Sequence, residues 1–249
     1  FTLLNTSTVL FFNFDNVSAL GESYNSTESF SIADIYRLNN GTTIGSGTGS
    51  NGPQFNSTGK YGGALEFDGI DDMVNVSTQV ANFSHPNNFS VTGWFRANNL
   101  TVNSGPISRC DFVSDDTYSG WNLRILASNR TRFIVASTGS IYKFSDSEPI
   151  SKDLWYHFAL IYNSTSTAIY INGISNLSNT TSQFTQNGST GRNRNITIGY
   201  NNCHKTFFNG SVDDIQIFNR SLSPTEVYQL YASSLTRYDV DKWSLFINQ

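Results

Sequence analysis

The residues with the clearest chemistry in this sequence are asparagines that could accept a glycan on their side-chain nitrogen. Attachment of an N-glycan requires the pattern Asn-X-Ser/Thr, in which X is not Pro. The chain has 29 asparagines, and 17 of them stand in this pattern. Its 58 Ser and Thr residues occupy about 23% of the 249 positions, so chance would give about 7 acceptors. Composition alone therefore does not explain the excess.

We predict that several of these acceptors carry N-glycans, because many fall in sequences typical of turns, where a glycan meets no core. A glycan coat indicates an extracellular or cell-surface protein, made in the secretory pathway of a eukaryote or by a glycosylating prokaryote, an archaeon included. The acceptors are Asn5, Asn16, Asn25, Asn40, Asn56, Asn75, Asn82, Asn88, Asn99, Asn129, Asn163, Asn176, Asn179, Asn187, Asn195, Asn209 and Asn219.

The charge balance argues against several classes of partner. Only 14% of the residues are charged, and 15 basic against 19 acidic side chains give a net charge of −4. Nucleic acids and anionic membrane surfaces both demand a basic face, so we expect neither as a partner. Apolar runs have the length of strands and stay below the roughly 18 residues of a membrane span, so we expect no direct membrane insertion.

The elements that must position these residues are mostly short strands separated by turns. Asn172-Gly173 joins two alternating runs and predicts a type I′ hairpin turn, and Gly-rich residues 39–60 predict a long loop. Ser223, Pro224 and Glu226 form a capping box that predicts one helix. We predict strands at 8–14, 62–76 with a break at 68–72, 89–96, 121–126, 132–137, 140–144, 155–162, 167–172, 195–200 and 240–247. This pattern indicates an all-β sandwich with one short C-terminal helix.

Three segments resemble signatures of laminin G-like domains in the concanavalin A-like lectin/glucanase superfamily. Residues 60–74 read KYGGALEFDGIDDMV, residues 89–96 read FSVTGWFR, and residues 208–227 read FNGSVDDIQIFNRSLSPTEV. The resemblance covers roughly residues 8–232. It implies a jelly roll of two antiparallel sheets, a concave face able to bind glycan and, in many members, one structural calcium.

The last residues fall outside this resemblance. We divide the chain into a laminin G-like sandwich over residues 1–234 and a connector over residues 235–249. The connector is similar to the segment that joins such domains in tandem in prokaryotic surface proteins. Because an unfinished strand exposes unpaired backbone groups, we expect it to pair with a following domain or a neighbouring copy of the chain. Because the first residues lack the pattern of a signal peptide, the extracellular compartment leads us to expect that a leader was removed or that the chain is an excerpt of a longer precursor.

Three acidic residues imitate the catalytic motif of retaining glucanases on this fold. Glu66, Asp68 and Asp71 nearly match Glu-x-Asp-x-x-Glu, in which two carboxylates about 5 Å apart act as nucleophile and acid/base. Here the third residue is Asp71, beyond a Gly at a turn, so we read a structural hairpin turn and expect no catalysis.

A structural Ca²⁺ is the more serious chemical proposal, since this ion takes six to eight oxygen ligands, several of them anionic. Acidic residues fall at strand ends that the implied fold brings together, and Asp15 and Asp214 are the first choices among Asp15, Asp68, Asp71, Asp72, Asp213 and Asp214. The alternative is that acidic turn residues cap their own backbone.

A glycan-binding site would need an aromatic platform beside planar polar groups. The candidates, in loops flanking strands of the implied concave face, are Asp111, Trp121, Asn122, Asn201 and His204. Trp121 could equally belong to the core. Cys110 and Cys203 lie in the same region, and a disulfide forms if their loops converge. The alternatives are two free buried thiols or bridges to other chains.

Two classes of function remain. The first is a structural or adhesive glycoprotein, a building block of a surface filament, layer or adhesin whose partners are copies of itself or further domains. The second is a carbohydrate-binding, lectin-like module. A glucanase is a remote third. The first is favoured because acceptors spread over nearly every loop would crowd a lectin face.

Overall fold

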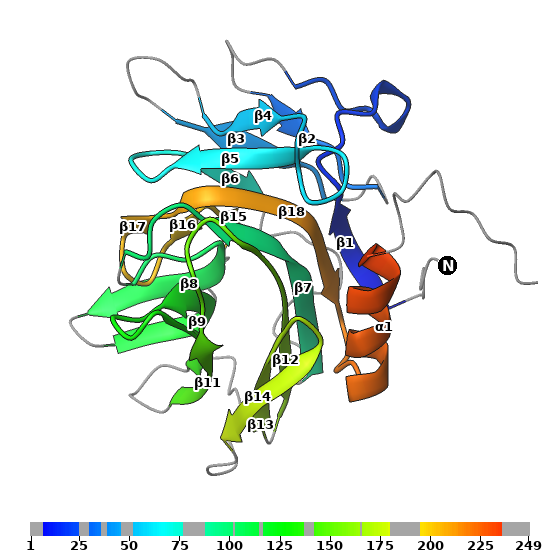
Figure 1. Cartoon of the computed structure of the whole chain (residues 1–249). Helices are drawn as coiled ribbons and strands as arrows, with labels where there is room; N and C mark the ends of the chain where they lie inside the picture. The colour runs from blue at the N-terminus through cyan, green and yellow to red at the C-terminus, as the bar shows by residue number, and fades with distance from the viewer. Residues whose placement is uncertain are drawn as a thin grey trace, which may run out of the picture.

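The computed structural model describes residues 7–24, 30–35, 39–45, 52–76, 88–101, 103–114, 117–136, 142–164, 166–179 and 195–235. Within these residues the chain folds into two large antiparallel sheets packed face to face, with one α-helix near the C-terminal end (Figure 1). The predicted two-sheet sandwich with one short C-terminal helix is thus confirmed. The predicted strand at 240–247 lies outside the described residues.

The first sheet, which we call the helix-side sheet, has eight strands. Its strand β18 pairs with β5, with β7 and with β1. Its central pair is β7 and β18, which lie antiparallel with a bulge between Asp213 and Gln216. In spatial order it contains β14 (Ile174–Asn179), β13 (Ser166–Ile171), β12 (Trp155–Asn163), β7 (Asn88–Ala97), β18 (Asn209–Phe218), β5 (Ala64–Asp68) and β4 (Gln54–Asn56), with β1 (Thr8–Phe12) off this path.

The second sheet, which we call the hairpin-side sheet, also has eight strands. A separate two-stranded hairpin, β16 (Tyr200–Asn201) and β17 (Thr206–Phe207), follows its strand β15. The spatial order is β11 (Tyr142–Pro149), β10 (Arg130–Ala136), β9 (Thr117–Ile125), β8 (Ile107–Ser114), β15 (Ile196–Ile198), β6 (Met73–Val76), β3 (Gly41–Ile44) and β2 (Ser31–Ile32).

The core lies between the sheets and is built from alternate side chains of their strands, as the pleat requires. Phe89, Val91 and Phe95 of β7 meet Leu123 and Ile125 of β9, and all are buried. Large aromatic rings supply much of this volume, which explains how a chain with 38% apolar residues fills two large sheets. Residues between these positions face outward and form the surfaces described below.

Helix α1 (Pro224–Leu235) covers part of the helix-side sheet on the face away from the core. Its Val227 is buried against Ala159, Ile161 and Phe218 of that sheet. The predicted capping box is present, since the Ser223 backbone N–H donates to Glu226 Oε2 (2.8 Å) and the Glu226 N–H donates to Ser223 Oγ (3.3 Å). A short 3₁₀ turn, η1 (Ser18–Leu20), follows β1.

The local predictions succeed where the signal is specific and fail where tertiary pairing decides. Asn172 and Gly173 have φ of 51° and 76°, as the predicted type I′ turn between β13 and β14 requires. The predicted long loop at 39–60 instead contributes β3 and β4, which pair with β6 and β5. Those polar, Gly-rich strands gain their order from the partner strands.

Candidate functional site

Trp121, the proposed sugar platform, lies in the core. Its side chain is 3% exposed and its ring packs 5.6 Å from the ring of Phe89 on the opposite sheet. The reason is the pleat of β9, because Trp121 alternates with Asn122 and shares the inner face with Leu123. Its ring is therefore unavailable to stack on a sugar, and this part of the expected site is corrected.

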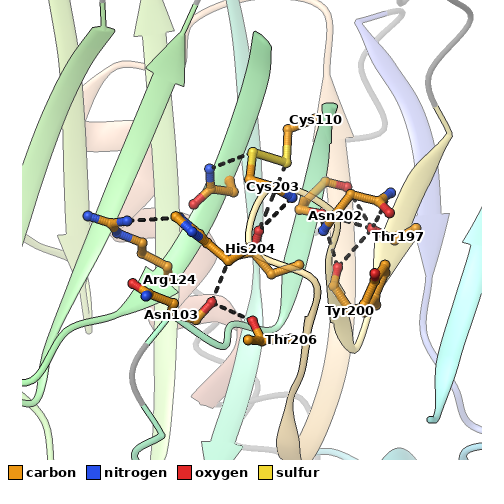
Figure 2. The surroundings of a disulfide bond; sticks show 12 residues. Asn103, Cys110, Arg124, Thr197, Tyr200, Asn202, Cys203, His204 and Thr206 are labelled. Carbon is orange, nitrogen blue, oxygen red and sulfur yellow. Dashed lines mark hydrogen bonds between the residues drawn. A yellow bond between two sulfur atoms is a disulfide. The ribbon is translucent and has the colours of Figure 1, made fainter. Parts of the chain in front are cut away.

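Asn122, Asn201 and His204 gather where the β16–β17 hairpin lies on the outer face of the hairpin-side sheet, and Figure 2 shows His204 beside the disulfide of this contact. Ser108 Oγ lies 2.8 Å from Thr197 Oγ1, donates to the Tyr200 carbonyl (3.0 Å) and accepts from the Asn202 backbone N–H (3.2 Å). Ser108 and Thr197 are buried beneath the hairpin. The hairpin is therefore bonded to β8 and β15 through side chains that point outward from the sheet.

A disulfide between Cys110 of β8 and Cys203 of the hairpin turn forms the centre of this contact (Figure 2). The two Cα atoms are 5.5 Å apart, and both residues are buried. Asn122 Nδ2 donates to Cys203 Sγ at 3.3 Å from the neighbouring strand β9. The bond closes a loop of 93 residues and joins the hairpin covalently to the face that it covers.

Asn201 and His204 bind the same hairpin to neighbouring segments through side-chain hydrogen bonds. Asn201 is fully buried, accepts from the Cys203 backbone N–H (3.1 Å) and donates through Nδ2 to the Asn103 carbonyl (3.0 Å). His204 Nε2 lies 2.8 Å from Arg124 Nη1, and burial together with the charge of Arg124 lowers the pKa of His204 to about 4. The imidazole is therefore neutral at pH 7 and accepts a hydrogen bond from the guanidinium.

The structure thus brings together Asn122, Asn201 and His204 of the predicted binding set, at the contact between the hairpin and the outer face of the sheet. The backbone of Asp111 pairs with Ser119 within the same sheet, and its side chain lies outside the described atoms. Sequence reasoning missed Tyr200 and Phe207, whose rings lie 4.5 Å apart and are half-exposed on the hairpin. Each strand of this hairpin has only two residues, which is too short to show the alternation of apolar and polar residues that predicts a strand.

The structure also gathers acidic side chains just after the end of β1 and at the bulge of β18. Asp15 Oδ1 accepts from the Gly63 N–H (3.0 Å), and Asp213 Oδ2 accepts from the Tyr61 N–H (2.9 Å). Asp213 is fully buried and Asp214 is 5% exposed. Burial raises the pKa of Asp213, and the charges of Asp214 and Asp15 raise it further. The buried carboxyl of Asp213 therefore lies beside two further acidic side chains, of which Asp214 is buried and Asp15 is partly exposed.

A second acidic group lies in the turn between β5 and β6. One carboxylate oxygen each from Asp68, Asp71 and Asp72 lies within 4.8 Å of the others, which is close enough to hold a metal ion. Burial, then the charges of Asp68 and Asp71, raise the pKa of Asp72 to about 6. Asp68 Oδ1 accepts from the backbone N–H groups of Ile70 (2.7 Å) and Asp71 (3.4 Å), as expected for a carboxylate that caps its own turn.

This capping role explains the imitation of a glucanase motif. Glu66 and Asp68 point outward from β5, since they alternate with Leu65 and Phe67, which are buried in the core. Glu66 Oε2 accepts from Asn56 Nδ2 (3.3 Å) on β4, and Asp68 binds its own turn. These carboxylates are therefore engaged in local structure on the helix-side sheet.

The asparagines divide into two sets by exposure. Among the acceptors with described side chains, none is buried; they are Asn16, Asn40, Asn56, Asn75, Asn88, Asn99, Asn129, Asn163, Asn195, Asn209 and Asn219. The buried asparagines of the described chain all lie outside the acceptor pattern; they are Asn13, Asn39, Asn122 and Asn201. The other acceptors (Asn5, Asn25, Asn82, Asn187 and the side chains of Asn176 and Asn179) lie outside the described part.

Two antiparallel sheets with these motifs define a concanavalin A-like sandwich, and sequence comparison supports the same class. The family model for the concanavalin A-like lectin/glucanases superfamily, of laminin G-like type, matches residues 68–228. The chain belongs to this family. Among curated proteins, none matches the chain by sequence.

Solved structures share the fold at low sequence identity. Domain 4 of AbnA, a GH43 extracellular arabinanase from Geobacillus stearothermophilus solved with arabinotriose, is 20% identical with a TM-score of 0.62, over 90% of this chain and 98% of that one. A sialidase of Trypanosoma rangeli is 16% identical with a TM-score of 0.63, and the match covers 95% of this chain and 34% of the sialidase. The binding domain of botulinum neurotoxin DC, solved with rat synaptotagmin II, is 20% identical with a TM-score of 0.63. That match covers 93% of this chain and 52% of the toxin domain's chain.

In the part of the chain that the structure describes, no helix is both long enough and apolar enough to cross a membrane.

Loss of the disulfide should destabilise the whole sandwich. Closing a loop of 93 residues should contribute about 4.5 kcal/mol by the chain-entropy relation. We expect the double variant Cys110→Ala/Cys203→Ala to melt roughly 10–15 °C below the parent, measured by calorimetry. Reduced parent protein should have the same melting temperature as the variant, and reductant should leave the melting temperature of the variant unchanged. A reductant that leaves the melting temperature of the parent unchanged would contradict the assignment.

Proposed function

We propose that this chain is a non-catalytic module of an extracellular protein, that its surface carries N-glycans, and that it serves as a structural or adhesive building block. Its partners would be copies of itself or further domains of the same surface protein, contacted through residues 235–249. The observation that carries the proposal is the division of the asparagines by exposure. All acceptors with described side chains reach the surface, and the buried asparagines lack the acceptor pattern.

The physical basis of this division is the size and polarity of a glycan. A sugar on the side-chain nitrogen of a buried asparagine would have to occupy core volume and would remove a hydrogen-bond donor. Asn201, for example, uses Nδ2 to bind the Asn103 carbonyl, so glycosylation there would conflict with the fold. The exposed acceptors, such as Asn16, Asn40 and Asn99, meet no such conflict.

A non-catalytic role agrees with the contacts made by the acidic side chains and by the β16–β17 hairpin. The β16–β17 hairpin, which the disulfide joins to β8, covers the middle of the outer face of the hairpin-side sheet. The carboxylates that imitate a glucanase motif bind backbone and amide groups of their own sheet. A disulfide suits an oxidising compartment, which agrees with an extracellular location.

Mass spectrometry of the chain purified from its native source tests the proposal directly. We expect an intact mass above the 27.6 kDa of the polypeptide and glycopeptides at several acceptors. Peptides that contain Asn13, Asn39, Asn122 and Asn201 serve as internal controls and should be unmodified at these residues. A native chain at the polypeptide mass would overturn the proposal.

Carbohydrate binding is a second candidate, favoured by the arabinanase domain that shares the fold over nearly its whole length and was solved with arabinotriose. In this chain the half-exposed rings of Tyr200 and Phe207 are better placed than Trp121 to contact a sugar. Asn202 and Thr206 belong to the same hairpin as Tyr200 (Figure 2). Such a site would use the hairpin as its platform.

A glycan array with the deglycosylated chain, followed by calorimetry on any hit, tests this second candidate. If Tyr200 and Phe207 form the platform, Phe207→Ala should weaken binding by about 1–3 kcal/mol, the usual worth of an aromatic stacking contact. Trp155→Ala, on the opposite sheet, is the matched control. Selective binding that survives Phe207→Ala would exclude this platform, and no binding would exclude the candidate.

We further propose one structural Ca²⁺ at Asp15 and Asp214, with Asp213 beside them. Two buried carboxylates, Asp213 and Asp214, lie near Asp15 of a separate segment, which supports this site. Among the described residues, however, the carboxylates whose oxygens lie within 4.8 Å of one another are those of Asp68, Asp71 and Asp72. Asp213 Oδ1 is also buried without a hydrogen-bond partner within the described residues. A divalent cation would offset the mutual repulsion that raises the pKa of Asp213.

Calcium titration with thermal melting tests this site. Saturating Ca²⁺, about 100-fold over its dissociation constant, should stabilise the fold by about 2.7 kcal/mol. Asp214→Asn should abolish the shift while preserving the backbone, since Asn tolerates the φ of 49° found there. Asp72→Asn, in the other acidic group, is the control and should retain the shift. A shift lost only in Asp72→Asn would move the ion to the turn between β5 and β6.

A further inference from the structure

The acceptor sites differ in a second property, the exposure of the Ser or Thr two residues after the asparagine. In one set, which we call the open acceptors, this residue is exposed. The pairs are Asn16 with Ser18, Asn40 with Thr42, Asn56 with Thr58 and Asn99 with Thr101. The hydroxyl of Thr58 donates to Asn56 Oδ1 (2.6 Å), so that bond stays within its own acceptor tripeptide.

In the other set, which we call the closed acceptors, the Ser or Thr is buried and its hydroxyl binds a distant segment. The Ser90 hydroxyl donates to the Arg220 carbonyl (2.8 Å), and the Thr131 hydroxyl donates to Ser147 Oγ (2.9 Å). Thr197 Oγ1 lies 2.8 Å from Ser108 Oγ of β8, and Ser211 Oγ accepts from Arg96 Nη2 (3.2 Å). The corresponding acceptors are Asn88, Asn129, Asn195 and Asn209.

N-glycosylation uses the asparagine and this hydroxyl together. The acceptor Nδ2 attacks the anomeric carbon of a lipid-pyrophosphate-linked oligosaccharide. The N–C bond forms as the C–O bond to pyrophosphate breaks, the amide loses one proton, and the lipid pyrophosphate leaves with the bonding electrons. The Ser or Thr requirement of the acceptor pattern means that the transferase must contact this hydroxyl while the asparagine reacts.

We propose that the fold itself selects the glycosylated asparagines, so that open acceptors are modified before or after folding and closed acceptors only before folding. The inference rests on the proposed function as a glycoprotein and adds the order of folding and modification. A closed acceptor can present its hydroxyl to an enzyme only after strands such as β10 and β11 separate, and such opening is a rare fluctuation of a packed sheet.

Asn40 and Asn129 form a matched pair for the test. Both side chains are exposed, and both acceptors have Thr at the third position. They differ in that Thr42 is exposed, whereas Thr131 is fully buried and its backbone N–H and hydroxyl both bind Ser147 Oγ at 2.9 Å. A difference in modification between them therefore reports the hydroxyl rather than the asparagine.

The experiment uses the full chain made in a host without N-glycosylation and folded with its disulfide. It is incubated with a purified oligosaccharyltransferase and its lipid-linked donor, and occupancy is followed at each site by mass spectrometry. Synthetic peptides around Asn40 and Asn129 give the unfolded reference. We expect both peptides to react at similar rates, and Asn129 to react at least about tenfold more slowly than Asn40 in the folded chain.

A shifted acceptor provides the positive control. Ala127→Asn with Asn129→Ser moves the acceptor two residues back within the β9–β10 turn and places its hydroxyl at the exposed position 129. This variant should be modified in the folded state, with folding checked by its melting temperature. Equal rates at Asn40 and Asn129 in the folded chain, or failure of the shifted acceptor to react in a chain that melts normally, would overturn this inference alone. A native chain without glycans would instead overturn the proposed function.

Discussion

The Cys110–Cys203 disulfide is the constraint on which the use of this surface depends. It joins the β16–β17 hairpin to the centre of β8, and the hydrogen bonds of Ser108, Asn122 and Asn201 complete the contact. Part of the outer face of the hairpin-side sheet is therefore covered by the chain's own backbone.

Burial of polar side chains then decides how the asparagines are used. A buried amide is tolerated only with hydrogen bonds to replace water. Asn39 Nδ2 binds the Val9 carbonyl (2.9 Å), and Asn201 binds two backbone groups. These residues belong to the fold, whereas none of the acceptor asparagines with described side chains is buried.

Much of the fold could be predicted from the sequence because its signals are local and specific. The capping box at Ser223, the Asn172-Gly173 turn and the three family-like segments all specify structure within a few residues. The candidate site could not be predicted as well. Trp121 follows Gly120 and reads as a loop residue, but pairing of β9 with β8 and β10 sets its pleat and turns the ring inward. Likewise, Asp213 is buried through a bulge in β18 that only long-range pairing reveals.

The central claim is that this sandwich displays glycans around a face closed by its own hairpin. A high-resolution electron-density or cryo-electron-microscopy map of the protein from its native source tests it most directly. The account predicts sugar density that extends from exposed acceptors such as Asn16, Asn40 and Asn99, with the hairpin in place over β8. Bare acceptors, together with a displaced hairpin and an oligosaccharide bound on the outer face of the hairpin-side sheet, would contradict it.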